Sequence, residues 1–284
     1  MKTDHSFKRF SLTIVWCWII LFALTPFCLV ISASFLHHNN EHLLMMPATL
    51  QNYAQINNNI YVCIFEKSFL VAGITTIFCL LIGYPFAFVL GRTQSRFKNL
   101  LIMLVIIPFW TSSLIRSYAL IAIIKAKGII NTALIGLGLI DQPIPILFTN
   151  IAVIIGLVYN LLPFMILPIM TNVERLDTRL IDAARDLGAS KFKTFSKIII
   201  PLTMPGIISG SILVFLPAMT MFYIPDILGG AKSILLGNLI QNQFMIAENW
   251  PMGSTFSTVL TLLLASLILL NVWVSRGNKK RDWL

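Results

Sequence analysis

Long stretches without a charged residue alternate with short charged segments along the whole chain of 284 residues. Six stretches hold an apolar core of about 20 residues, the length that an α-helix needs to cross a lipid bilayer. The pattern therefore predicts an all-α membrane protein, folded as a single domain over residues 1–284, with six transmembrane helices. We place these helices near residues 12–36, 68–91, 99–124, 150–172, 198–222 and 253–275.

The stretch 117–140 is the ambiguous element of this assignment. It is apolar enough to suggest a seventh span, but Lys125 and Lys127 interrupt it. We predict instead a short helix over Ile129–Ile140 that lies on the outer membrane interface, with Asn131 as its N-cap.

Basic residues gather on one side of the predicted membrane. With six spans, 16 of the 21 Lys and Arg residues fall in tails and loops of the same side. They are Lys2, Lys8, Arg9, Arg92, Arg96, Lys98, Arg175, Arg179, Arg185, Lys191, Lys193, Lys197, Arg276, Lys279, Lys280 and Arg281. Because basic loops stay inside the cell, we predict that both termini are cytoplasmic. The asymmetry also accounts for the net charge of +10 without a nucleic-acid partner.

Composition and motif content argue against an enzyme. Charged residues make up 11% of the chain, whereas a soluble domain carries roughly 25%. The four cysteines form no CxxC pair, and neither HExxH nor GxSxG occurs, so we expect no metal, no cofactor and no catalytic residues. Gly229–Ser233 lacks the GK[ST] triplet of a P-loop, so we expect no ATP binding there.

Aromatic and acidic residues near proline-containing helix segments suggest a path for a cationic solute. Proline removes a backbone hydrogen bond, and bent membrane helices tend to face protein or a water-filled cavity. Aromatic faces and carboxylates attract cations, so we take as candidate pathway residues Trp110, Tyr159, Tyr223 and Asp226. The alternative is that the aromatic residues belong to interfacial belts and that Asp226 caps the following loop. Arg116, a charge inside the third span, has no partner identifiable from the sequence.

A charged amphipathic segment precedes the fifth span. Asp177 or Thr178 can cap a short helix that runs to Leu187, in which Leu180 and Ala184 share an apolar face with Leu176 and Leu187. Gly188 then follows, where a left-handed residue can end the helix and turn the chain. Ser190 can cap a second helix that continues into the fifth span, so a push on the first helix would reach the membrane.

The spacing of this segment resembles the EAA signature of type I ABC-importer permeases. Asp182-Ala183-Ala184, three residues, Gly188, nine residues and Ile198-x-Ile200-Pro201 match it, with Asp182 in place of Glu and Ile200 in place of Leu.

The resemblance implies the type I ABC importer permease fold in a multi-pass protein of the bacterial inner membrane. It implies that a cytoplasmic coupling segment, residues 174–197, binds an ATPase subunit. The coupling residues would be Asp182, Ala183, Ala184, Arg185, Asp186 and Gly188. The expected partners are two ATPase subunits, a second related permease and a periplasmic or extracellular solute-binding protein.

Four longer stretches resemble the polyamine permeases of this family. They are Pro108–Leu120, Val153–Pro168, Asp182–Ile208 and Phe222–Lys232. The resemblance implies spermidine and putrescine as solutes, moved by alternating access that partner ATPases drive. The alternatives are a permease for sulfate, molybdate or an iron chelate, and a secondary carrier that works alone.

Overall fold

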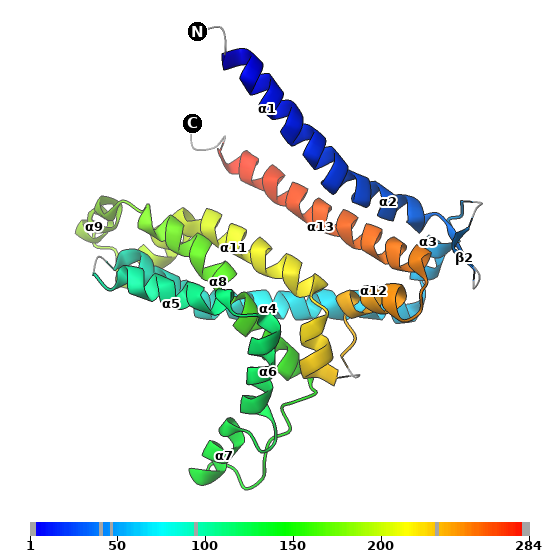
Figure 1. The fold of residues 1–284 in the computed structure, drawn as a ribbon. Coiled ribbons are helices and arrows are strands. Elements are labelled where there is room, and N and C mark those ends of the chain that lie inside the picture. The colour runs from blue at the N-terminus through cyan, green and yellow to red at the C-terminus, as the bar shows by residue number, and fades with distance from the viewer. Residues whose placement is uncertain (1–3, 40–41, 46–47, 94–95, 231–232, 280–284) are drawn as a thin grey trace. The chain divides into compact units, whose positions relative to one another are not determined.

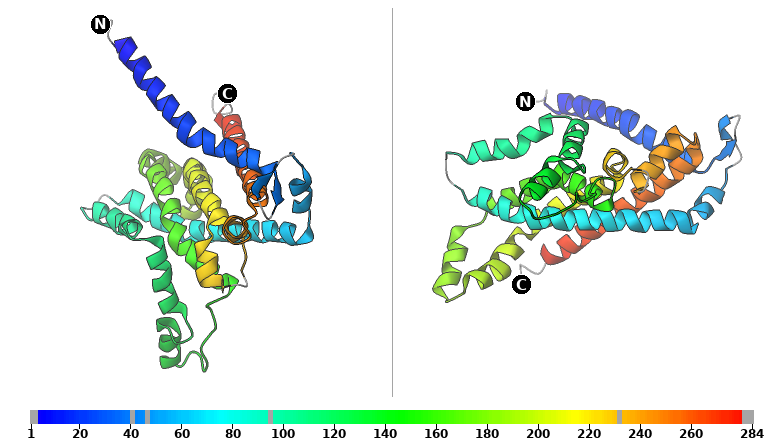
Figure 2. Two further views of the ribbon diagram at one scale, coloured as in Figure 1. Left: turned by 45° about the vertical axis from the view of Figure 1, so that its right-hand side comes forward. Right: turned by 90° about the horizontal axis from the view of Figure 1, so that it is seen from below.

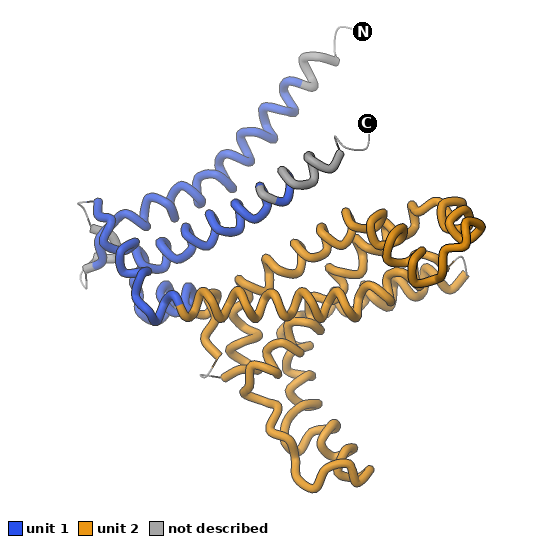
Figure 3. Tube along the Cα trace, turned by 180° about the vertical axis from the view of Figure 1, so that it is seen from behind, with its two compact units in different colours: residues 1–62, 239–284 blue, residues 63–238 orange. Residues whose placement is uncertain are grey.

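The chain is helical almost throughout (Figure 1). The computed structural model describes residues 4–39, 42–45, 48–93, 96–230 and 233–279. Contacts divide it into two compact units, residues 1–62 with 239–284 and residues 63–238 (Figure 3). The boundaries fall inside helices α4 (Asn59–Arg92) and α12 (Leu236–Met245). A single domain over 1–284 stays a prediction.

The number of membrane-spanning segments agrees with the sequence. Within the described residues, six segments are long and apolar enough to cross a membrane, by length and composition. They are Arg9–Ser34, Asn59–Arg92, Ser113–Gly136, Asn150–Glu174, Lys191–Thr220 and Trp250–Leu269. The prediction of an all-α membrane protein with six spans is therefore confirmed.

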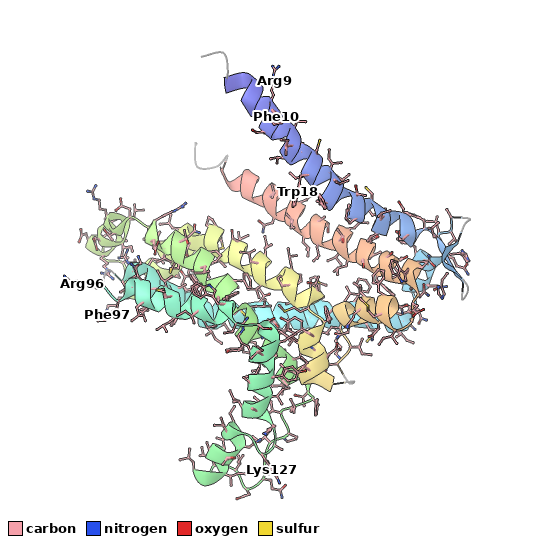
Figure 4. All side chains as sticks on the ribbon, viewed as in Figure 1. Arg9, Phe10, Trp18, Arg96, Phe97 and Lys127 are labelled. Atoms are coloured by element: carbon pink, nitrogen blue, oxygen red, sulfur yellow. The ribbon has the colours of Figure 1, made fainter. Side chains whose placement is uncertain are left out.

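The first unit begins with three consecutive helical elements, α1 (Asp4–Ile19), the π-helix η1 (Ile20–Leu24) and α2 (Thr25–Ser34). Pro26 has no N–H for an α-helical bond to Phe22, which favours the irregular hydrogen bonding just before it. Apolar side chains project outward from this path, and Figure 4 labels two of them, Phe10 and Trp18, which are 65% and 63% exposed. Such a surface suits lipid contact.

Helix α13 (Trp250–Lys279) packs against α2 in the same unit. The hydroxyl of Thr255 donates to the carbonyl of Ser34 at 3.1 Å, and the Ser34 hydroxyl pairs with that of Tyr53 at 2.7 Å. Tyr53 lies on the short helix α3 (Gln51–Ile56). Between α2 and α3, strands β1 (His37–Asn39) and β2 (His42–Met45) form an antiparallel hairpin.

Three long helices form the core of the second unit: α4 (Asn59–Arg92), α8 (Asn150–Glu174) and α11 (Ile200–Thr220). A stripe of α8 at four-residue spacing is fully buried, namely Leu157, Leu161, Met165 and Ile169. Lipid tails are as apolar as these side chains, so the helices gain from close packing rather than from leaving water. A Cβ at Gly210 of α11 would lie 2.8 Å from the sulfur of Met165, so glycine permits the close contact of α11 with α8.

The third span differs from the prediction, because the segment long enough to cross is Ser113–Gly136 and includes residues 129–136, which we predicted to lie on the interface. Instead of one helix over 99–124, the structure has α5 (Lys98–Trp110) and α6 (Ser113–Ile124), separated by extended backbone at Thr111. The Thr111 hydroxyl donates to the carbonyl of Pro108 at 2.7 Å, a local bond that competes with helix continuation. As a result α6 leaves the direction of α4 at a steep angle (Figures 1 and 2).

The short helix α7 (Ile129–Gly136) follows α6, and the prediction that Asn131 caps it is wrong. Gly128 occupies the N-cap position, and Asn131 lies inside the helix, fully buried. Its side-chain oxygen accepts from the N–H of Ile144 at 2.9 Å, and its amide donates to the carbonyls of Ile144 at 3.0 Å and Lys125 at 3.3 Å. Asn131 thus closes the loop after the helix, because a partner 13 residues later competes with the cap.

The connection from α11 to α12 (Leu236–Met245) contains the π-helix η3 (Pro225–Gly229). Side chains of other helices hold it. The N–H of Leu236 donates to the Ser68 hydroxyl of α4 at 2.8 Å, and the Ser233 hydroxyl donates to Asn150 of α8 at 2.8 Å. These bonds fix the segment against the core of its unit.

Candidate functional site

Helix α9 (Thr178–Asp186) begins on a local signal. The carboxylate of Asp177 accepts a hydrogen bond from the N–H of Arg179 at 2.9 Å and so occupies the N-cap position. An N-cap satisfies one of the backbone N–H groups that have no partner within the helix. Of the two caps that the sequence allowed, the structure uses Asp177.

The same helix ends in the glycine turn that the sequence predicted. The N–H of Ala189 donates to the carbonyl of Ala184 at 3.0 Å, and the N–H of Gly188 donates to that of Arg185 at 2.9 Å. This pair of bonds is the Schellman motif, and Gly188 has the left-handed φ of +81° that it requires. The predicted elbow at Gly188 is confirmed as a feature of the backbone.

The side chains of α9 divide into a buried face and a large exposed face. Ile181 and Ala184 are buried, whereas Leu180 is 50% and Leu187 is 89% exposed. The apolar face expected from the sequence is therefore wrong in part: Ala184 is buried as expected, but Ile181, which that face did not include, is buried and Leu180 is not. Five of the six candidate coupling residues are exposed: Asp182, Ala183, Arg185, Asp186 and Gly188. The sixth, Ala184, lies beneath them.

The elbow leads without a break into the fifth span. Ser190 caps α10 (Lys191–Thr194), as predicted, by accepting a hydrogen bond from the N–H of Lys193 at 3.3 Å. The π-helix η2 (Phe195–Ile199) follows and joins α11. Because Pro201 has no N–H to give the carbonyl of Lys197, regular α-helical bonding fails there. π-Helical turns of this kind often occur at functional sites.

The segment after the elbow is tied to α4. The ring of Phe195 lies 5.7 Å from that of Tyr84 and 6.2 Å from that of Phe88, measured between centroids. The Tyr84 hydroxyl pairs with that of Thr203 at 2.9 Å, and Thr203 also donates to the carbonyl of Ile199 at 2.9 Å. A displacement of the elbow would therefore reach α4 as well as α11.

Two of the candidate pathway residues lie on α5 and α8. Trp110, the last residue of α5, is 80% exposed, and Tyr159 of α8 is 45% exposed. The guanidinium carbon of Arg116 lies 5.9 Å from the centre of the Tyr159 ring, a cation–π contact. The structure thus gives Tyr159 a cationic neighbour and supplies the partner of Arg116 that the sequence did not identify.

The other two candidates lie where α11 gives way to η3. Tyr223 is half-buried, and its hydroxyl points to the sulfur of Met221 at 3.8 Å. Asp226 is exposed, and its carboxylate accepts a hydrogen bond from the Asn238 side chain. The Asn238 amide also donates to the carbonyl of Phe222 at 2.7 Å. Asp226 therefore has a structural partner, and a pathway shared by the four candidates stays a prediction.

Sequence reasoning missed Asn238. Its side chain is 2% exposed and binds Asp226, Phe222 and the N–H of Leu235, the last at 3.2 Å. Asn238 follows Asp226 by 12 residues across a turn, and no local spacing marks this pairing. In the sequence Asn238 is one of four amide side chains between Leu236 and Met245, so nothing there singles it out.

Metal-ligating side chains do not cluster in the part of the chain that the structure describes. Its described residues contain no group of three His, Cys, Asp or Glu placed to hold a metal ion. The second unit has an exposed helix α9, a turn at Gly188 and a continuous helical path from α10 to α11, together with aromatic and acidic side chains. These elements could transmit a displacement of α9 and bind a cation.

Comparison with known proteins agrees with this arrangement. The sequence model of the family described as "Binding-protein-dependent transport system inner membrane component" matches residues 83–280. The "Spermidine/putrescine transport system permease protein PotB" of Haemophilus influenzae is 50% identical over 93% of each chain. The protein of the same name from Escherichia coli K12 is 48% identical over 93% of this chain and 96% of its own. In fold, the chain is similar to a bacterial ABC transporter that imports alginate, with a TM-score of 0.77, 13% identity and coverage of 97% and 96%.

Proposed function

This chain belongs to the family of binding-protein-dependent transport system inner membrane components, and on that premise we propose that its solute is a polyamine. It is a multi-pass permease subunit of the inner membrane. The observation that carries the proposal is the identity of 45–50% to spermidine/putrescine permeases, over 93% or more of this chain.

The chemistry of the candidate pathway fits a polycation. Trp110 and Tyr159 present aromatic faces, and Asp226 presents an exposed carboxylate. Aromatic rings attract ammonium groups through their quadrupole, and a carboxylate pairs with them directly. At Trp110 and Asp226, an anion such as sulfate would need donors and positive charge instead. The four candidate residues are therefore assigned to the solute path.

Helix α9 is the proposed docking element for an ATPase subunit. Its exposed leucines, Leu180 and Leu187, lie among charged side chains, and an apolar patch with a charged rim suits contact with another protein. In this proposal the residues from Asp182 to Gly188 face the ATPase, and segment 174–197 is cytoplasmic, as are both termini. The complete importer contains two ATPase subunits, a second related permease and an external solute-binding protein.

The mechanism proposed is alternating access. ATP-driven closure of the ATPase subunits pushes α9, and the Gly188 elbow passes the displacement to α10 and α11. The contact of Phe195 with Tyr84 carries part of it to α4. Reorientation of these bent helices would open the solute path first to the binding protein and then to the cytoplasm.

Uptake by the complete importer in proteoliposomes tests the proposed solute. Labelled spermidine and putrescine should enter in an ATP-dependent way and labelled sulfate should not. Uptake of sulfate, or uptake by this chain without ATPase subunits, would contradict the proposal.

Asp226→Asn tests the charge within that path. Asparagine keeps an oxygen that can accept the bond from Asn238, so the fold should persist while the charge is lost. We expect polyamine uptake to fall about tenfold, as for loss of a charged contact worth about 1.4 kcal/mol. Co-purification of the partner subunits should not change. Unchanged uptake would leave Asp226 with a structural role alone.

A further inference from the structure

Arg116 holds its guanidinium group over two aromatic rings inside the second unit. The guanidinium carbon lies 5.5 Å from the centre of the Phe109 ring and 5.9 Å from that of Tyr159. The three residues belong to three helices, α6, α5 and α8. The break between α5 and α6 at Thr111 turns the chain, so that Arg116 and Phe109 meet although they belong to separate helices. The result is an aromatic cation site that the chain fills with its own cation.

The surroundings of Arg116 do not explain its charge by ordinary pairing. Its Nε atom is buried and has no hydrogen-bond partner among the described residues. The helix that carries it, α6, is otherwise uncharged and apolar, with Ile115 67% exposed next to Arg116. Ionisable groups in apolar membrane segments are costly and tend to mark solute or ion pathways. Among the residues that the structure describes, the two rings are the contacts that stabilise this cation.

The aromatic site is not sealed. Tyr159 is 45% exposed, and Phe109 is partly exposed. Phe109 also contacts Phe164 edge to face, with centroids 5.0 Å apart, and Trp110 beside it is 80% exposed. A second cation at the Phe109 and Tyr159 rings would meet the guanidinium group of Arg116 there. Two cations cannot share one pair of ring faces without repulsion.

We propose that the Phe109–Tyr159 site binds an ammonium group of the transported polyamine, and that Arg116 is a tethered competitor for it. This inference rests on the proposed function. Arg116 fills the site when no solute is present and displaces the solute's ammonium group after it arrives. The competition keeps the dwell time of a polycation short, which a transport path requires because a deep binding site would trap its solute.

Replacement of the Arg116 guanidinium group should lengthen the time for which the Phe109–Tyr159 site holds a polyamine. Arg116→Gln removes the charge and keeps a polar side chain of moderate length. Labelled spermidine is loaded onto the complete importer in proteoliposomes, and the binding protein is then washed away. The Arg116→Gln importer should bind the remaining spermidine about five- to tenfold more tightly than the wild type. Maximal uptake should fall by a similar factor. Arg116→Lys keeps a cation near the rings, so its retention of spermidine should lie closer to that of the wild type than to that of Arg116→Gln.

A double variant separates competition from structural damage. Phe109→Leu removes one ring, so Phe109→Leu combined with Arg116→Gln should lose the extra retention seen with Arg116→Gln alone. Equal retention by the wild type and Arg116→Gln would overturn the inference, as would extra retention that survives loss of the ring. If Arg116→Gln fails to assemble, Arg116→Lys with Phe109→Leu remains informative: it should show weaker retention than Arg116→Lys, and equal retention would contradict the site. Absence of polyamine uptake by the wild type would instead refute the proposed function.

Discussion

Two short helices of the second unit end in the same way and differ in the surface that they present. Helix α7 is followed by Leu137 and Gly138, and helix α9 is followed by Leu187 and Gly188. The glycines have left-handed φ values of +66° and +81°, and the two turns have the same Schellman pair of hydrogen bonds. Both leucines are exposed, by 74% and 89%.

The chemistry of the exposed faces separates the two helices. Helix α7 has no charged residue and exposes apolar side chains such as Ile129, which is 68% exposed. Helix α9 carries four charges, on Arg179, Asp182, Arg185 and Asp186. The glycine turn therefore determines where each helix ends, and the charge pattern determines whether its exposed face suits lipid or a protein partner. We expect lipid at α7 and a protein partner at α9.

Valine at the two glycines gives the largest expected difference. A Cβ at either position has nothing within 4 Å, so the cost is conformational, about 1–2 kcal/mol for a left-handed residue. In the proposed mechanism the elbow of α9 transmits the push of the ATPase, so Gly188→Val should reduce coupled uptake by at least about tenfold, as for a misplacement near a working site. Gly138→Val should leave uptake near normal. Uptake and ATP hydrolysis are measured in the same proteoliposomes.

A conservative variant controls for the backbone effect. Asparagine tolerates the left-handed conformation, so Gly188→Asn should retain most of the coupled uptake. Normal uptake by Gly188→Val would show that the turn at Gly188 does not transmit the displacement of α9. Equal losses of uptake in Gly138→Val and Gly188→Val would show that α7 and α9 do not differ in their role in coupling.

The buried amide of α7 gives the next largest effect, on stability. Asn131→Ala removes three hydrogen bonds, two with Ile144 and one with the carbonyl of Lys125. Each contributes about 0.5–1.5 kcal/mol net, so the thermal unfolding midpoint of the purified complex should fall by several degrees. Association with the ATPase should not change. A variant with wild-type stability would show that water replaces the amide.

The N-cap of α9 gives the smallest effect. Asp177→Ala should cost about 1 kcal/mol of helix stability, because the cap lies at an exposed helix end. Asp177→Asn keeps a capping oxygen and should match the wild type. Hydrogen exchange of the α9 amides measures the difference, with faster exchange expected in the alanine variant alone. No change in exchange would mean that contacts with the rest of the unit hold the helix.

Local signals predict the start of α9 and the turn that ends it. Asp177, Gly188 and Ser190 act on neighbours within five residues, so their effect can be inferred from spacing. The number of spans followed in the same way, from the length of apolar stretches. What a helix contacts at long range does not follow from such signals.

The predictions that were wrong, and the residues that were not predicted, depend mainly on contacts beyond the local sequence. Asn131 was predicted as a cap, but it binds Ile144, 13 residues away. The continuous third span failed at Thr111, where one side-chain hydrogen bond decides between helix and extended chain. Asn238 and the aromatic partners of Arg116 come from separate elements, which the fold alone brings together. Side-chain partners across helices required the structure.

Photo-crosslinking from the two matched leucines tests the central claim most directly. A photo-reactive amino acid replaces either Leu187 or Leu137 in the complete importer, at two exposed helix ends of equal backbone geometry. We predict a crosslink to the ATPase subunit from position 187 and none from position 137. No crosslink from position 187, or an equal one from position 137, would contradict the assignment of α9 as the docking helix.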